Sequence, residues 1–228
     1  MGQKRIIYAC DIGTTQYSAK TGLPSFAWAR LNPEDGAIHV SSYIYKLVQQ
    51  LESDIRQGYS ISLGFEAPLF IPVPEDWQDL SKGREGDGNR PWSASSGAYV
   101  TTLGIHQSAW ILRRLHESSS RKCEFTLDWR RWWPPSGHQP ILFCWEAFVS
   151  GEAHSGDHIR DAATAADFFH CYEQKLEEIR EVKAKCTISL IGAVALWSGW
   201  VRDLMFTHEP TLVIKPKEPF RGDYQNLD

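Results

Sequence analysis

Three apolar runs in this sequence each end on an acidic residue. The run at residues 5–10 precedes Asp11, the run at 60–66 ends on Glu66 before Ala-Pro, and the run at 140–146 ends on Glu146. Short apolar runs predict buried strands, and the carboxyl ends of parallel strands meet at one edge of a sheet. If the strand at 60–66 lies beside the strand at 5–10, Asp11 and Glu66 come to the same edge.

The segments between these runs predict how the strands are connected. Residues 25–31 and 37–41 read as strands around a turn at Asp35-Gly36, and the apolar residues of 44–55 recur at helical spacing, with serines before them as caps and Gly58 as a stop. Three later helices and a final strand are expected at 97–117, 156–185, 188–204 and 211–215. This order predicts an α/β fold: a mixed five-stranded sheet flanked by helices, with a C-terminal helix and short strand.

Length and composition indicate a folded protein of one domain. The chain has 228 residues, 42% of them hydrophobic and 23% charged, which is ordinary globular usage. We expect one domain over residues 1–215, with a long insertion at 68–96 and a surface tail at 216–228. A net charge of −4 argues against binding nucleic acid through overall charge, though not against a local basic patch. Without a signal-peptide core or a bilayer-spanning apolar run, we expect a cytoplasmic protein with no membrane partner.

Three stretches carry a resemblance to a known superfamily. "YACDIGTT", "GFEAPL" and "DHIRDAATAA", in this order of elements, resemble the RNase H-like superfamily, in particular its RuvC-type resolvases and the predicted nucleases related to them. The resemblance spans roughly residues 5–185. It implies an RNase H-like fold and a nuclease that hydrolyses phosphodiester bonds of DNA or RNA with two Mg²⁺ or Mn²⁺ ions. RuvC-type enzymes work as dimers, so a homodimer is also implied. The apolar helix near Ile188 would be its interface or else part of the core.

The resemblance also implies a set of metal ligands. By matched position, Asp11 bridges both ions, Glu66 is the second ligand, and Asp161, with Asp157 one helical turn earlier, is the helix-borne pair. The alanines at 162, 163, 165 and 166 give that helix a small-residue surface, which lets it approach the sheet closely. Magnesium suits such a site because it prefers carboxylate and water oxygens.

Each of these acidic residues has a structural alternative. Asp11 before Gly13 would otherwise cap a turn, Glu66 would be a solvated strand end, and Asp157 after Gly156 is well placed as a helix N-cap. Glu146 is a further candidate ligand or a structural residue. His158 is a candidate for proton transfer, and together with His154 and Asp161 it has a spacing that a zinc site uses.

Candidate substrate contacts lie in three segments. In the first, the backbone amides and hydroxyls of Thr14 and Thr15 are suited to hold a phosphate. The two others are the loop "GREGDGNRPWSASSG", with an Arg and Asp cluster comparable to that of the related predicted nucleases, and "LDWRRWWPP", which is suited to base stacking. Their alternatives are a solvated loop and a packed hydrophobic corner. The residues concerned are Arg84, Asp87, Arg90, Arg130, Arg131 and Trp132.

Two other functions fit parts of the sequence. "IYACDIGTT" also resembles the first phosphate loop of the actin and heat-shock chaperone ATPases, but a second such stretch is absent from the chain. A non-catalytic RNase H-like module that binds nucleic acid or protein is the other alternative, since a fold does not dictate its chemistry. Acidic residues at all three matched stretches favour the nuclease.

Overall fold

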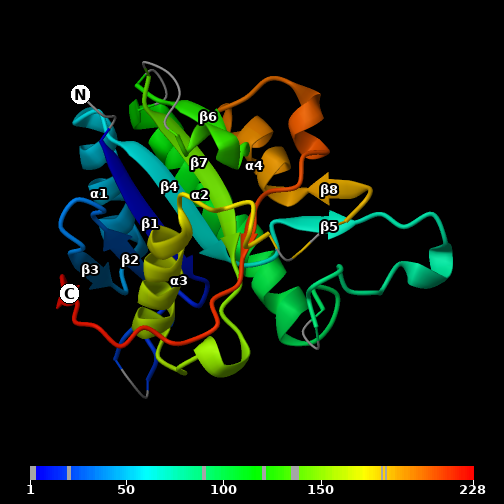
Figure 1. The fold of residues 1–228 in the computed structure, drawn as a ribbon, viewed down its shortest axis with the longest axis horizontal. Coiled ribbons are helices and arrows are strands. Elements are labelled where there is room, and N and C mark those ends of the chain that lie inside the picture. Colours follow the sequence, from blue (N-terminus) through cyan, green and yellow to red (C-terminus); the bar gives the residue numbers. More distant parts are fainter. Residues whose placement is uncertain are drawn as a thin grey trace.

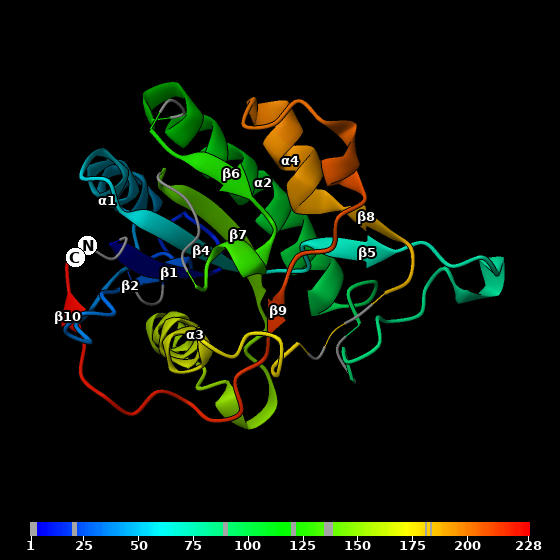
Figure 2. The same cartoon turned by 45° about the horizontal axis from the view of Figure 1, so that its top comes forward.

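The protein is an α/β structure built on one mixed, mostly parallel sheet. The computed structural model describes residues 4–19, 22–88, 91–119, 122–134, 139–180, 182 and 184–228. Helices cover both faces of the sheet: α3 (His158–Tyr172) lies on one face, and α1 (Ile44–Arg56), α2 (Ser96–Ser119) and α4 (Leu190–Ser198) lie on the other (Figure 1 and Figure 2). The α/β class predicted from the sequence is confirmed.

The five predicted strands occupy the middle of the sheet. In spatial order they are β3, β2, β1, β4 and β7, where β1–β2 and β2–β3 pair antiparallel and β1–β4 and β4–β7 pair parallel. Along β1, Ile6, Tyr8 and Cys10 enter the core under α1 and α2, whereas Ile7 and Ala9 enter the core under α3. The bounds are β1 Arg5–Asp11, β2 Ala27–Leu31, β3 Ile38–Ser41, β4 Ser60–Glu66 and β7 Ile141–Ala147.

Further strands extend this sheet beyond the predicted five. β9 (Val213–Ile214) pairs with β7 and lies within the short strand expected at 211–215, whereas β6 (Glu124–Thr126), which also pairs with β7, and β10 (Gln225–Asn226), which pairs with β3, have no counterpart in the prediction. This sheet has eight strands in the described part of the chain, so the expectation of a five-stranded sheet is wrong, because β6 and β10 are too short to leave an alternating pattern. A separate ribbon joins β5 (Phe70–Pro72), inside the insertion, to β8 (Thr187–Ser189).

The third helix is shorter than its sequence pattern predicts. It ends at Tyr172 rather than near residue 185. The reason is a long-range contact: the buried carboxylate of Glu173 accepts hydrogen bonds from Arg5 and from the indole of Trp132, which fixes a turn there. The last predicted helix is also shortened, since β8 takes its first residues and Gly199, in the left-handed conformation, caps it after Ser198. The remaining one-turn helices are η1 Trp77–Asp79, η2 Trp129–Arg131, η3 Gly151–Ala153 and η4 Leu204–Thr207.

The C-terminal segment lies at the surface, as expected, but it is also bound to the edge of the sheet. Beyond the β10–β3 pairing, the side chain of Asp228 accepts hydrogen bonds from the Ser41 hydroxyl and the Ser42 backbone N–H. These serines were expected to cap the first helix, but its N-cap is Tyr43, which makes no side-chain capping bond. Both serines instead hold the C-terminal segment against the edge of the sheet.

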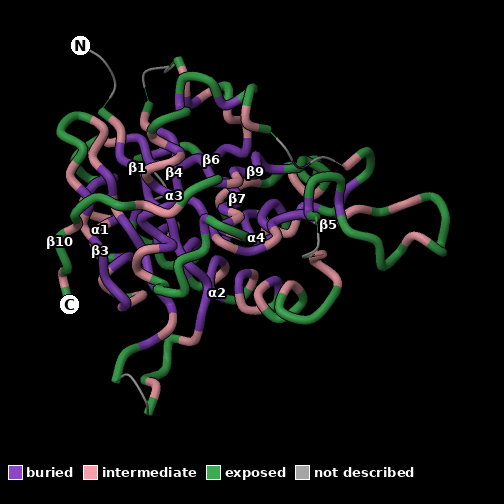
Figure 3. Tube along the Cα trace, turned by 60° about the horizontal axis from the view of Figure 1, so that its bottom comes forward, coloured by how far each residue is buried: buried purple, intermediate pink, exposed green. Residues whose placement is uncertain are grey.

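Small residues let two helices approach the sheet where β1 and β4 end. The predicted alanine surface of α3 is confirmed: Ala162, Ala163, Ala165 and Ala166 are all buried. On the opposite face, Gly104 of α2 packs on Ala67, and a Cβ at this position would overlap the Ala67 side chain. The central strands are buried and the projecting connections are exposed (Figure 3). None of the described helices is long and apolar enough to cross a membrane.

Candidate active site

Asp11 and Glu66 lie side by side at the carboxyl edge of the sheet. They are directly paired in the parallel register of β1 and β4, so the prediction that both reach the same edge is confirmed. Asp11 is buried and Glu66 is partly exposed. Both line a hollow of about 400 Å³, together with His154 and His158. Glu146 lines it too, so three carboxylates and two imidazoles face one cavity.

His158, the first residue of α3, is in direct contact with Asp11. Its Nδ1 lies 2.9 Å from Oδ2 of Asp11, and the imidazole is about half exposed. Burial raises the pKa of Asp11, and the hydrogen bond to His158 opposes that shift. The same hydrogen bond raises the pKa of His158, which favours the imidazolium form. The two side chains form a hydrogen-bonded ion pair that retains its proton to a higher pH than a solvated histidine would.

Asp161 lies behind this pair and is fully buried. Its Oδ1 accepts hydrogen bonds from the backbone N–H and the hydroxyl of Ser155, at 2.8 and 2.7 Å. Its Oδ2 lies 2.7 Å from Nδ1 of His154, yet it accepts no well-aligned hydrogen bond in the described structure. The charge of Asp161 is near enough to raise the pKa of Asp11. From the sequence, a zinc site or proton transfer was considered for the histidines of this segment, His154 included, whereas nothing in the sequence indicated a role for Ser155.

Asp157 has a different role from the one that the resemblance implies. It is the N-cap of α3, and its Oδ1 accepts hydrogen bonds from the backbone N–H groups of Ile159 and Arg160. Its side chain is exposed and does not line the hollow. The N-cap alternative is therefore what the structure shows, and only Asp161 of the expected pair lies against Asp11.

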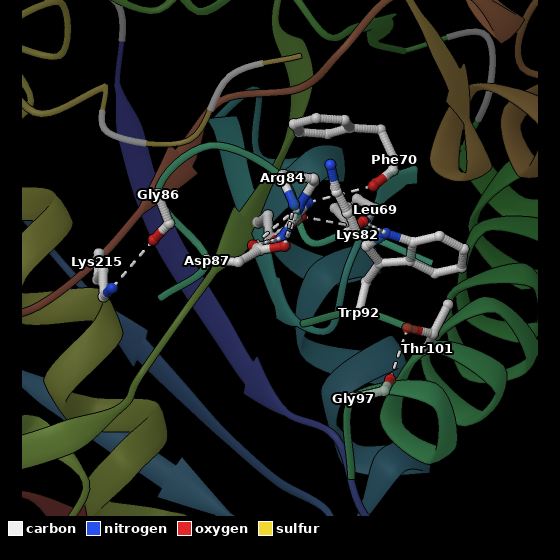
Figure 4. A network of polar contacts seen from close by, with 11 residues as sticks. Leu69, Phe70, Lys82, Arg84, Gly86, Asp87, Trp92, Gly97, Thr101 and Lys215 are labelled. Atoms are coloured by element: carbon white, nitrogen blue, oxygen red, sulfur yellow. Dashed lines mark hydrogen bonds and ion pairs between the residues drawn. The ribbon is translucent and has the colours of Figure 1, made fainter. Parts of the chain in front are cut away.

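Glu146 is part of a buried ion-pair network that also includes Arg84 and Asp87. Arg84 Nη1 and Nη2 donate to the two carboxylate oxygens of Glu146, at 2.7 and 2.6 Å. Arg84 also donates to Asp87 through Nε and Nη2 and to the Phe70 carbonyl through Nη1 (Figure 4). Burial alone would lower the pKa of Arg84, but the two carboxylates raise it above its usual range.

This network ties the insertion to the sheet. All five N–H donors of the Arg84 guanidinium are used within the protein, so none is left for a phosphate. Glu146 also accepts a hydrogen bond from the Leu69 backbone N–H, which occupies both of its oxygens and favours its structural alternative. Arg90, the third predicted contact of this loop, lies outside the described residues.

The other predicted substrate contacts lie away from this hollow. Trp132 is 1% exposed and packs against Phe143 and Phe169, so it is not free to stack on a base, and the structure shows the alternative of a packed hydrophobic corner instead. Arg130 and Arg131 are paired with acidic neighbours, Asp128 and Glu124 respectively. Thr14 and Thr15 follow Asp11 in the chain but line a second hollow, together with residues of α2.

Comparisons with protein-family models, with curated proteins and with solved structures find no significant match to this chain. The case for its function therefore depends on the strand order, the geometry of the carboxyl edge and the resemblance in the three short stretches.

Proposed function

We propose that this protein is a divalent-metal-dependent nuclease that hydrolyses phosphodiester bonds. The observation that carries the proposal is the pairing of Asp11 with Glu66 at the ends of two parallel strands, with Asp161 and two histidines of the α3 region beside them. The strand order β3-β2-β1-β4-β7, antiparallel on one side of β1 and parallel on the other, also supports an RNase H-like fold. In that fold a carboxylate cluster at this edge is the catalytic centre.

The donor set at this edge suits Mg²⁺ or Mn²⁺. Asp11, Glu66 and Asp161 would hold the ions, and the buried Oδ2 of Asp161, which accepts no well-aligned hydrogen bond, is consistent with that role. In the described residues no group of three or more His, Cys, Asp or Glu side chains is arranged to hold an ion as it stands. Nδ1 of His158 contacts Oδ2 of Asp11, so a metal ion and the imidazole would compete for that oxygen. When bound, the metal would activate a water and stabilise the leaving oxygen.

The chain's own residues would position the substrate and move a proton. His158 is half-exposed at the hollow, and its hydrogen bond to Asp11 raises the pKa of the imidazole and so favours the imidazolium form. Such an imidazolium can protonate the leaving oxygen as the phosphodiester bond breaks. Ser155 fixes one oxygen of Asp161, which orients the other towards His154. The buried network of Arg84 keeps the insertion against β7, which forms one wall of the hollow.

The proposal is tested by incubating the purified protein with labelled single-stranded, duplex, hybrid and four-way-junction substrates. We expect cleavage of at least one substrate in Mg²⁺ or Mn²⁺ and none in excess chelator. Failure to cleave any substrate in either metal would contradict the proposal. Nucleic-acid binding without any cleavage would favour the non-catalytic module instead.

Divalent metal is also expected to stabilise the fold. At metal concentrations about 100-fold above the dissociation constant, binding to the native state adds about 2.7 kcal/mol. For a chain of this size that corresponds to a rise in Tm of about 5–10 °C, measured by thermal unfolding with and without Mg²⁺ or Mn²⁺. Glu66→Gln should lose most of this rise. Glu209→Gln, the same change at an exposed residue elsewhere, should keep it. Equal metal-induced rises in both variants would exclude Glu66 as a ligand.

A further inference from the structure

An exposed group of aromatic side chains lies beside the candidate active site. Four of the seven exposed aromatic residues in the described part of the chain are Tyr17, Tyr45, Tyr99 and Trp110. Tyr43 links the first two, with ring centroids 6.3 Å from Tyr17 and 5.7 Å from Tyr45. We call these five residues the aromatic surface.

The aromatic surface borders a hollow of about 530 Å³. Tyr99 and Trp110 line it from one face of α2, where residues 99, 103, 106, 107 and 110 follow helical spacing, and the segment from Thr14 to Gln16 lines it from the other side. Tyr17 and Tyr45 adjoin Gln16 and Ile44, which are both lining residues. The hollow thus has aromatic walls and a polar rim.

One buried polar atom of this hollow has no hydrogen-bond partner. Gln107 is 7% exposed, its Nε2 donates to the carbonyl of Gly13, and its Oε1 accepts no hydrogen bond in the described structure. An unsatisfied buried amide oxygen is costly, so a ligand that brings an N–H or O–H group here would recover that free energy. Amino and imino groups of nucleic-acid bases are such donors.

α2 lines both this hollow and that of the candidate active site. Ser96, Gly97 and Val100 line the one that contains Asp11, and Tyr99 and Trp110 line the other. The segment from Asp11 to Thr14 joins them at the edge of the sheet. A strand whose phosphodiester lies at Asp11 would therefore pass over Thr14 to reach the aromatic surface.

We propose that the aromatic surface binds unpaired bases of a single-stranded nucleic acid and extends the substrate site, an inference that rests on the proposed nuclease function. Aromatic rings take up any base by stacking, but only when its face is not already covered by duplex neighbours. A chain of net charge −4 cannot rely on overall electrostatic attraction, so stacking has to supply much of the affinity. Two cations lie against these rings and could contact a phosphate: Lys46, whose Nζ lies 4.9 Å from the Tyr43 ring centroid, and Arg114, whose guanidinium lies 5.7 Å from the Trp110 ring centroid.

The test is a binding measurement in excess chelator, so that affinity is measured apart from cleavage. The probes are fluorescent single strands of about twelve nucleotides, in DNA and RNA forms, and blunt duplexes of the same sequence. We expect the wild type to bind a single strand at least about 10-fold more tightly than the duplex. The double variant Tyr99→Ala/Trp110→Ala should lose at least about 10-fold in single-strand affinity, because it removes two rings on which bases would stack.

Two further variants make the result specific. Trp110→Phe retains a ring and should keep most of the affinity, whereas Trp77→Ala/Trp197→Ala removes two exposed rings elsewhere and should leave it unchanged. Equal affinity for duplex and single strand, or wild-type affinity of the Tyr99/Trp110 double variant, would overturn the proposal. A loss as large in the Trp77/Trp197 control would also overturn it. None of these outcomes depends on cleavage, so failure of the nuclease proposal would be seen separately in the metal-dependent assay.

Discussion

Asp11→Asn is expected to abolish metal-dependent cleavage while leaving the protein at least as stable as the wild type. Asparagine keeps the volume of the side chain and can still accept the hydrogen bond from His158 through its amide oxygen. It lacks the negative charge that a divalent ion requires. Substitution of a residue that hydrogen-bonds a metal ligand typically lowers activity about 10- to 100-fold, so loss of a ligand itself should lower it more than about 100-fold.

The stability side of this prediction follows from the pKa of Asp11. Burial raises that pKa, which means that the ionised carboxylate is less favourable in the folded than in the unfolded state. A neutral residue removes this cost at every pH above the pKa, so Tm at pH 7.5 should be unchanged or higher. Asp203→Asn is the matched control, because it makes the same change at the exposed N-cap of η4 and asparagine caps as well as aspartate. Wild-type cleavage by Asp11→Asn would remove the proposed mechanism.

The pairing of Asp11 with Glu66 could be predicted because it depends on local and topological rules. Each residue ends a recognisable apolar run, and the helix between β3 and β4 fits a right-handed crossover that sets β4 parallel to β1. The alanine surface of α3 was likewise readable, since small residues at four close positions leave few other ways to pack. To predict these features one needs only the order of the helices and strands and the periodic spacing of side chains along them.

The roles of Trp132 and Arg84 could not be predicted because their partners are distant in the sequence. The run of tryptophans and arginines has the composition of a stacking surface, yet Trp132 packs on Phe143 and Phe169 and donates to Glu173. Arg84 finds Glu146 across 62 positions. Local composition does not distinguish a basic side chain that is free to bind a ligand from one that is buried against carboxylates.

The aromatic surface was missed for a related reason. Tyr17, Tyr45, Tyr99 and Trp110 come from three separate segments, and none of these segments is enriched in aromatic residues as the 127–135 stretch is. Its one sequence signal is the spacing of Tyr99 and Trp110, which places both on one face of a helix. That face is normally read as core packing, and only the structure shows that both rings are exposed.

Arg84→Met is expected to be strongly destabilising, because it leaves two carboxylates buried without their cation. Asp87 and Glu146 are 2% and 1% exposed, and both accept hydrogen bonds from the guanidinium. Breaking a buried ion pair by removal of one partner typically costs about 3–5 kcal/mol. Thermal unfolding at pH 7.5 should show a fall in Tm of about 10 °C or more. Arg113→Met, which removes an exposed i,i+4 pair with Glu117, should cost less than about 0.5 kcal/mol.

The pH dependence of this loss identifies its cause. Burial already raises the pKa of Glu146, with Arg84 opposing the shift, so removal of Arg84 should raise that pKa further. An acid whose pKa is higher in the folded than in the unfolded state destabilises the fold while it is ionised. This destabilisation disappears as the pH falls through the folded-state pKa, because the acid is then neutral. The difference in Tm between Arg84→Met and the wild type should therefore shrink as the pH is lowered from 7.5 towards 5, and adding Glu146→Gln should recover part of it at pH 7.5. If Arg84→Met lost cleavage without a change in Tm, Arg84 would instead be a substrate contact, as the sequence alone suggested.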